Sequence, residues 1–269
     1  MIKKLRVLSL GAGVQSTTLA LMIEKGEVPM IDCGIFADTM AEPLNVYTHL
    51  DWLKKQVSFP IHIVSFRNLK EDIIQAAKGN FKSFHAPFFS KDENGKKGIL
   101  FRTCTRNYKI EPINKKVREL LGYSKGQRVK KETEVQMLMG ISKDEISRTS
   151  RNKLKYIKNM YPLIDLDMRR NDCIEWMEKN NYPRPPRSAC TFCPYHSTKE
   201  FKDIKENSEK EWQEVVEIDE IIRNNKHPKI HQPLYVHSSC TPLKDIDLDE
   251  KQDQQDLFND ICDDGMCGV

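Results

Sequence analysis

The first third of the chain alternates between short apolar runs and segments with helical spacing. Apolar runs at residues 5–10, 30–37 and 61–65 contain many branched side chains, which is typical of buried strands. Between and after them, residues 17–25, 46–56 and 69–78 have the periodicity of helices. Strands that alternate with helices form an α/β layer, because each pair of parallel strands needs a crossover connection. We therefore expect an α/β fold: about five parallel strands with helices on both faces.

The remaining chain extends this pattern and then changes character. A helix is predicted over 106–121, a buried strand over 134–141 and a helix over 170–179, whereas 79–97 contains turn signals and reads as a long loop. The proline-rich stretch PRPPRSAC then leads into a cysteine-bearing segment and a charged helix over 198–224. We divide the chain into a nucleotide-binding α/β domain, 1–182, and a small cysteine-bearing C-terminal extension, 183–269.

Composition and charge narrow the class of protein. Hydrophobic residues make up 39% and charged residues 30% of the chain, and no apolar stretch approaches the ~18 residues that span a bilayer. The first residues lack the pattern of an export signal, so a cytoplasmic protein without a membrane partner is expected. The formal charge is only +4, but residues 125–131 and 151–158 are basic. Such stretches are ordinarily solvated faces, and the alternative is a phosphate-rich partner.

The sequence VLSLGAGVQSTTL joins the first strand to the first helix through a glycine-rich turn. A turn of this kind presents backbone N–H groups and the positive end of a helix dipole to an anion. Gly11 and Gly13 permit a tight turn and close approach of a phosphate, but the loop matches neither the Walker A pattern nor G-x-G-x-x-G. By itself it is either a phosphate-binding loop or a structural turn.

Five stretches in order resemble the PP-loop proteins of the adenine nucleotide alpha-hydrolase superfamily. The similarity is to the branch with phosphoadenosine phosphosulfate (PAPS) reductases and DNA-phosphorothioation ATPases, and it covers roughly residues 5–195. The stretches are GAGVQST, FADTMAEP (with Asp38, Thr39 and Glu42), CTRNYKIEPI (with Cys104, Lys109 and Pro112), GISKDEISR (with Gly140, Glu145 and Arg148) and YPLIDLDMRRNDCIEWM. Gly11 and Gln15 depart from the pattern, since ATP-cleaving members carry Ser and Asp there.

The resemblance implies an adenine nucleotide, either ATP or a phosphosulfate nucleotide, bound at the carboxyl edge of the strands, and Mg²⁺ is a further candidate cofactor. Lys109 and Arg148 are the implied catalytic cations, suited to phosphate or sulfate recognition. Asp38 could instead cap the following helix. The implied nucleotide-binding residues are Ser9, Gly11, Ala12, Gly13, Gln15, Ser16, Thr17, Asp38, Thr39 and Gly140.

Eight cysteines in a chain expected to be cytoplasmic indicate metal or redox chemistry rather than disulfides. Cys190 and Cys193 form a C-x-x-C whose two thiolates can bind one metal, but a further ligand is required. PAPS reductase-like proteins with a 4Fe-4S cluster also use a cysteine before the K-x-x-P segment, which implies Cys104 as that ligand. Cys240 is a candidate fourth ligand. Zinc held by Cys190, Cys193 and His196 with one more residue is the alternative.

The C-terminal sequence ICDDGMCGV contains another candidate site. PAPS reductases carry a catalytic cysteine in a terminal E-C-G-L-H segment, and Met266-Cys267-Gly268 is similar without the Glu or the His. Cys267 is thus a candidate thiolate nucleophile, Cys262 and Cys267 form a candidate redox pair, and a plain disordered terminus is the third interpretation. Cys33 and Cys173 lie in apolar or helical contexts and are expected to be buried structural thiols.

The resemblance implies a PP-loop enzyme of sulfur chemistry that carries an iron–sulfur cluster, and three hypotheses are open. In the first, a PP-loop ATP pyrophosphatase and sulfurtransferase adenylylates a carbonyl or a nucleic-acid base, and sulfur from the cluster or a cysteine displaces AMP. A thiol or other sulfur donor is then an expected partner. In the second, a PAPS reductase-type oxidoreductase uses Cys267 to attack the sulfur of a phosphosulfate nucleotide. In the third, a metal-stabilised module binds nucleic acid without catalysis.

Overall fold

The computed structural model describes residues 4–249, and its centre is a five-stranded sheet in which all neighbouring strands are parallel. The strand order is β3-β2-β1-β6-β7. The sheet confirms the expected α/β class. The strands are β1 (Lys4–Leu10), β2 (Cys33–Asp38), β3 (Ile61–Ser65), β6 (Glu134–Met139) and β7 (Ile157–Met160).

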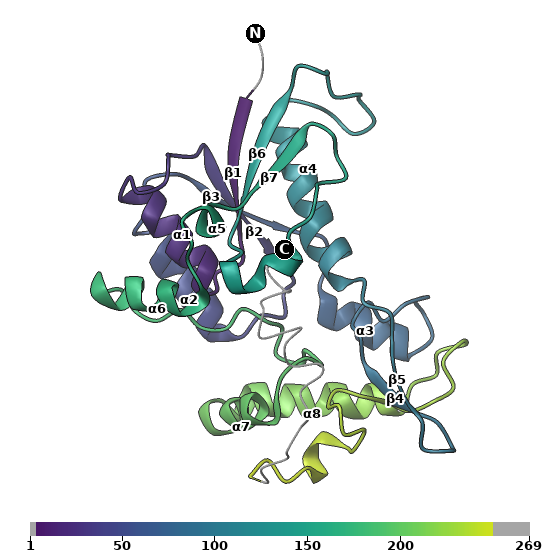
Figure 1. Cartoon of the computed structure of the whole chain (residues 1–269). Coiled ribbons are helices and arrows are strands. Elements are labelled where there is room, and N and C mark those ends of the chain that lie inside the picture. Colours follow the sequence, from purple (N-terminus) through teal and green to yellow (C-terminus); the bar gives the residue numbers. More distant parts are fainter. Residues whose placement is uncertain (1–3, 250–269) are drawn as a thin grey trace.

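Helices cover both faces of this sheet (Figure 1). On one face, α1 (Val14–Glu24), α2 (Leu44–Leu53) and α6 (Arg170–Lys179) share a core with β1, together with the short α5 (Pro162–Asp165). On the other face, α4 (Glu111–Leu120) packs on the opposite side of β1, β2 and β6. No helix within residues 4–249 is long and apolar enough to cross a membrane.

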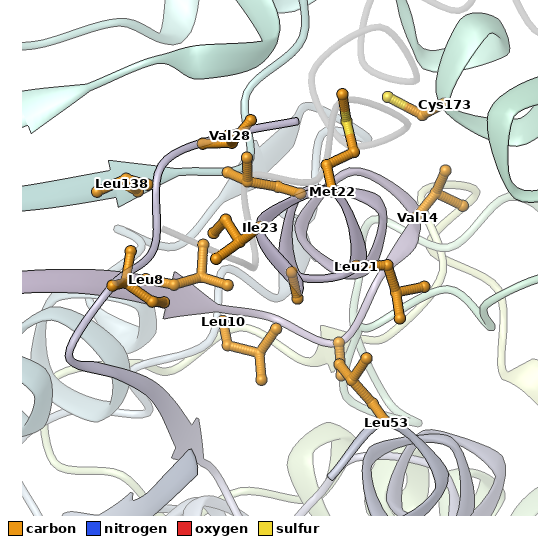
Figure 2. Close-up of a cluster of buried hydrophobic side chains, with 14 of the residues drawn as sticks. Leu8, Leu10, Val14, Leu21, Met22, Ile23, Val28, Leu53, Leu138 and Cys173 are labelled. Carbon is orange, nitrogen blue, oxygen red and sulfur yellow. The ribbon is translucent and has the colours of Figure 1, made fainter. Parts of the chain in front are cut away.

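The core between α1 and the sheet explains why the glycine turn is held rigidly. Every residue of α1 from Val14 to Ile23 is buried, because strands lie on one side of this helix and α2 and α6 on the others. In Figure 2, Leu8 and Leu10 of β1, Leu53 of α2 and Cys173 of α6 surround α1. Burial raises the pKa of the Cys173 thiol to about 12, in keeping with the expected structural role.

A second layer lies beside the main sheet. Its three-stranded antiparallel sheet, in the order β5-β4-β8, consists of β4 (Phe89–Lys91), β5 (Lys97–Ile99) and β8 (Leu234–Tyr235). A separate core joins this sheet to the helices α3 (Leu69–Ala77), α7 (Thr198–Asn207) and α8 (Glu209–Arg223). Because this core draws on residues 41–108 as well as 192–243, the two layers are interleaved in sequence. The boundary at residue 182 stays a prediction.

Several expected elements differ in the structure. The predicted loop over 79–97 contains the β4–β5 hairpin. The predicted helix over 106–121 begins as a π-helical turn, Thr105–Ile110, and continues as α4. The single helix predicted over 198–224 is two helices, because Ser208 is extended and its side chain accepts a hydrogen bond from the Glu211 N–H at the start of α8. A short 3-10 segment, Lys143–Arg148, follows β6, and another, Leu243–Asp245, follows β8.

Candidate functional site

The glycine turn lies at the topological switch point of the sheet. Connections from β1 run towards β2 and β3 on one side, whereas β6 and β7 lie on the other, so the carboxyl ends of β1 and β6 lie at the position where α/β proteins commonly bind ligands. Gly140 directly follows β6 and packs against the first turn of α1. A Cβ at Gly140 would lie 2.8 Å from both the Cα and the backbone nitrogen of Ser16. Only glycine allows this close approach.

The helix that follows the turn has no side-chain cap at its N-terminus. Ala12 has a φ of 59°, in the left-handed region, and Gly13 is the extended residue that precedes the helix. The Ser16 hydroxyl accepts a hydrogen bond from the Gly11 N–H (3.2 Å) and donates one to the Gly13 carbonyl (3.3 Å), which closes the turn. Gly13, the N-cap residue of α1, has no side chain that could accept a hydrogen bond from the first N–H groups of the helix. The first turn of an eleven-residue helix therefore offers its N–H groups to an anion.

Gln15, expected to bind the nucleotide, connects α1 to two other segments. Its amide nitrogen donates to Glu145 (2.8 Å), and its amide oxygen accepts a hydrogen bond from Arg170 of α6 (3.2 Å). Glu145 is fully buried and also pairs with Arg148, whose side chain is only 8% exposed. Arg148 is thus held two contacts away from the glycine turn. The polar side chain of Gln15 fixes the segment that carries this arginine.

A buried ion pair lies next to the turn. Lys109 Nζ is 3.1 Å from Glu42 Oε1, with side chains 9% and 0% exposed, so both charges are removed from water. The other carboxylate oxygen of Glu42 accepts a hydrogen bond from the Ser188 hydroxyl (3.3 Å). Ser188 in turn faces Gly13, since a Cβ on that glycine would lie 3.7 Å from the Ser188 Cβ. A path of neighbouring residues, Gly13, Ser188, Glu42 and Lys109, therefore leads from the glycine turn to the buried lysine.

Lys109 lines a pocket that also contains three cysteines. Cys104, Cys190 and Cys193 all line it, although they come from two segments more than 80 residues apart. The other lining residues are mainly apolar, apart from the cations Lys109 and Arg102. The full lining is Thr39, Leu69, Ala86, Pro87, Arg102, Cys104, Thr105, Lys109, Cys190, Phe192, Cys193, Pro194 and Tyr195. The three thiols predicted to act together as metal ligands thus lie around one cavity.

Cys190 has a tightly defined environment within this pocket. Its Sγ is 3.3 Å from the Thr39 hydroxyl, and its carbonyl lies 2.9 Å from Nε2 of His196 and accepts the Cys193 N–H. Burial, followed by the nearby Glu42 carboxylate, raises the pKa of the Cys190 thiol well above its usual range. No group of three or more His, Cys, Asp or Glu side chains in residues 4–249 surrounds a position for a single metal ion.

Cys104 is held by a histidine that the sequence did not single out. The carbonyl of His85 accepts the N–H groups of both Thr103 and Cys104, at 3.0 Å each. Its Nδ1 lies 2.8 Å from the Thr103 hydroxyl and 3.2 Å from the amide nitrogen of Asn107. Because an amide nitrogen can only donate, Nδ1 accepts and the ring proton is on Nε2. His85 has a φ of 64°, which turns its carbonyl towards the start of the π-helical turn.

Some predicted site residues lie elsewhere or have other contacts. Asp38 accepts hydrogen bonds from the Met40 N–H (2.7 Å) and the Tyr47 hydroxyl (2.8 Å), so it holds the turn after β2 rather than capping α2. Cys240 does not line the pocket, because it lies beside the small sheet with its Sγ near the Ser90 carbonyl. Cys267 is outside the described residues.

Sequence reasoning assigned no role to the contact between Ser188 and Glu42. Glu42 belongs to the FADTMAEP stretch, but its partner Ser188 is 146 residues away. The available signal was the position of Ser188, two residues before the C-x-x-C and directly after a proline-stiffened connector. His85 had no such signal, since its contribution depends on the direction of a backbone carbonyl.

No protein-family model and no curated protein matches the chain. Among solved structures, the chain is similar to the crystal structure of a phosphoadenylyl-sulfate (PAPS) reductase from Candida auris in complex with phosphate. The two share 14% sequence identity with a TM-score of 0.43, and the match covers 69% of this chain and 76% of the reductase.

Proposed function

We propose that the chain is a PP-loop enzyme of sulfur chemistry that binds an adenine nucleotide and carries out ATP-dependent sulfur transfer. The observation that supports this proposal is the path of contacts from Gly13 through Ser188 and Glu42 to Lys109 and the cysteine pocket. This path connects a candidate anion site with a group of thiols, which suits a reaction that releases pyrophosphate and adds sulfur to an acceptor.

In the proposed reaction, the phosphates of ATP lie at the N-terminus of α1. A carbonyl oxygen of the acceptor attacks the α-phosphorus and pyrophosphate leaves, with the developing negative charge stabilised by backbone N–H groups and a nearby cation. A hydrosulfide then adds to the activated carbon. AMP departs with the original oxygen and a proton is released, so that the C=O of the acceptor becomes C=S without any net redox change. We assign Lys109 as the cation that stabilises this developing negative charge.

The cysteine pocket is the proposed place for the sulfur donor. A 4Fe-4S cluster is ordinarily held by four cysteine thiolates, and Cys104, Cys190 and Cys193 would hold three of its irons and leave the fourth without a cysteine ligand. When bound, a cluster of this type supplies an iron that can bind an inorganic sulfide. The apolar lining excludes water, which protects an activated acceptor from hydrolysis. The alternative is that the same C-x-x-C holds zinc.

The proposal is tested by nucleotide turnover and metal content of anaerobically isolated protein. We expect ATP to bind, pyrophosphate release to depend on an acceptor, and the protein to contain iron and acid-labile sulfide. Gly13→Val adds a branched side chain at the turn and should abolish ATP binding while the far-UV circular dichroism stays unchanged. Unchanged affinity in this variant would remove the turn from the site.

Cysteine variants separate the pocket from the other thiols. Cys104→Ser and Cys190→Ser should each lower the iron content, whereas Cys240→Ser, a buried thiol outside the pocket, should retain it. One zinc and no iron would exclude the cluster. Thiol-dependent sulfite release from a phosphosulfate nucleotide, lost in Cys267→Ser, would replace sulfur transfer by the reductase reaction.

A further inference from the structure

The two basic stretches of the sequence meet at one edge of the main sheet. Residues 125–131 lie in the loop before β6, and residues 151–156 lie in the loop before β7. Because β6 and β7 are parallel neighbours, both loops reach the amino edge of the sheet, at the top of Figure 1. The two loops are joined where the Val135 N–H donates to the Tyr156 carbonyl at 2.8 Å. Cations that are distant in sequence therefore share one surface.

We call this surface the basic edge. It contains eight exposed cationic side chains, and no ion pair within residues 4–249 involves any of them. Two carboxylates, Glu132 and Glu134, and the cation Lys4 of β1 lie beside it. The eight side chains are Lys125, Arg128, Lys130, Lys131, Arg151, Lys153, Lys155 and Lys158.

The first of these loops is folded by its own hydrogen bonds. The Arg118 guanidinium donates to the carbonyls of Ser124 (3.0 Å) and Gln127 (2.6 Å), and the Tyr123 hydroxyl contacts the Thr133 hydroxyl at 3.1 Å. Since Arg118 of α4 and the hydroxyls of Tyr123 and Thr133 make these contacts, the lysines of the loop are not needed for its conformation. A preformed loop loses less conformational entropy when its cations bind a ligand.

The second loop is built in the same way. The Tyr161 hydroxyl both accepts the Ser150 N–H (2.9 Å) and donates to the Ser150 carbonyl (2.7 Å), while Asn152 accepts the Leu154 N–H at 2.9 Å. The three cations of this loop, Arg151, Lys153 and Lys155, and Lys158 of β7 are again exposed to solvent. Eight like charges on the two loops and β7 repel one another unless an anionic partner is bound.

We propose that the basic edge binds the phosphate backbone of a nucleic acid, independently of base sequence. A phosphodiester chain carries regularly spaced charges that can pair with several cations at once, and the release of its counterions drives binding. An anionic membrane fits less well, because none of the exposed large apolar side chains lies in 122–133 or 149–158 to insert into it. This inference goes beyond the proposed function, since strands of about six residues separate the basic edge from the carboxyl edge by ~20 Å.

The test is fluorescence anisotropy with labelled 30-nucleotide DNA and RNA of random sequence, single-stranded and duplex, at several salt concentrations. With five to six phosphates contacted, the logarithm of the affinity should fall with the logarithm of the salt concentration with a slope of about −5. The triple variant Lys125→Glu, Arg128→Glu, Lys130→Glu should bind at least ~30-fold more weakly and reduce this slope by about 3. The DNA and RNA arms identify which phosphate backbone binds better.

A matched control has the same change in net charge on another surface. Lys78, Lys82 and Lys229 are exposed and lie in or beside the second layer, so the triple change of these lysines to Glu should leave nucleic-acid affinity within about threefold. Equal losses in both triple variants, no binding by the wild type, or equal binding to polyglutamate or anionic vesicles would overturn the proposal. ATP binding is measured on the same variants and should be unchanged, so a failure of the proposed function is detected separately.

Discussion

Replacing Gly140 by Ala tests the close approach between the end of β6 and the first turn of α1. The added methyl carbon would lie 2.8 Å from the Cα and nitrogen of Ser16 and 3.0 Å from its Cβ. Ordinary carbon contacts lie at about 3.5 Å or more, so one segment has to move by roughly 0.7 Å. The atoms in the way are mainly backbone in a fully buried helix, and no flexible side chain can yield in their place.

We expect this variant to lose about 1–3 kcal/mol of unfolding free energy, as overpacked sites do. For a chain of this size that is a fall in Tm of roughly 3–10 °C, measurable by differential scanning calorimetry. Because the displacement falls on the Ser16 N–H, ATP affinity should fall about tenfold, which corresponds to ~1.4 kcal/mol in equilibrium dialysis.

Two controls separate steric overlap from a general loss of stability. Gly13→Ala meets nothing closer than 3.7 Å and has an extended backbone, so its unfolding free energy should change by less than about 1 kcal/mol. Val215→Ala creates a cavity in the core beneath α8 and should lower the Tm similarly without weakening ATP binding. A Gly140→Ala protein with wild-type Tm and affinity would refute the described packing of this turn.

Three further variants test other parts of the site. Lys109→Met leaves a buried carboxylate unpaired and should cost about 3 kcal/mol in urea unfolding, and a loss below about 1 kcal/mol would contradict the burial of this ion pair. Burial lowers the pKa of His49 from 6.5 to about 4, so the unfolded chain takes up the proton first as the pH falls. The contribution of neutral His49 to the unfolding free energy is therefore complete above pH 6.5 and falls by up to about 3 kcal/mol towards pH 4. His49→Gln should flatten the dependence of the unfolding free energy on pH in this range, whereas the same change at exposed His231 should not. His85→Ala should speed the alkylation of Cys104, measured by mass spectrometry, at least threefold. His85→Asn should retain much of the restraint on Cys104, because Asn tolerates positive φ. Equal alkylation rates in the wild type and both variants would show that His85 does not position this thiol.

The sequence predicted the main sheet well because its signals there were local. Strand β3 and helix α6 begin and end at the expected residues, since a short branched run and a helical period are each readable within ten residues. Strand β7 was missed because Ile157 and its neighbours were interpreted by their charge. The break at Ser208 was missed as well, although a serine three residues before a glutamate is a start signal for a helix.

The candidate site was predicted in part for the same reason. The order of the motifs indicated that Cys104, Cys190 and Cys193 belong together, and all three line one pocket. The contact between Ser188 and Glu42 crosses 146 residues and depends on how a connector folds back, which no local pattern encodes. The contribution of His85 follows from a backbone carbonyl, and a single sequence does not record its direction.

The segment that carries Ser188 lies between the glycine turn and the C-x-x-C. Ser188 faces Gly13 on one side and donates a hydrogen bond to Glu42 on the other, and three residues later the Thr191 N–H donates to the Ala41 carbonyl at 3.0 Å. Cys190 lies between these two anchors. We expect a ligand that displaces Ser188 at the glycine turn to move the C-x-x-C or to break the contact with Glu42, whose loss leaves buried charge less well satisfied. In the proposed function, this short stretch of backbone, anchored at Ser188 and Thr191, would link nucleotide binding at the glycine turn to the thiol pocket.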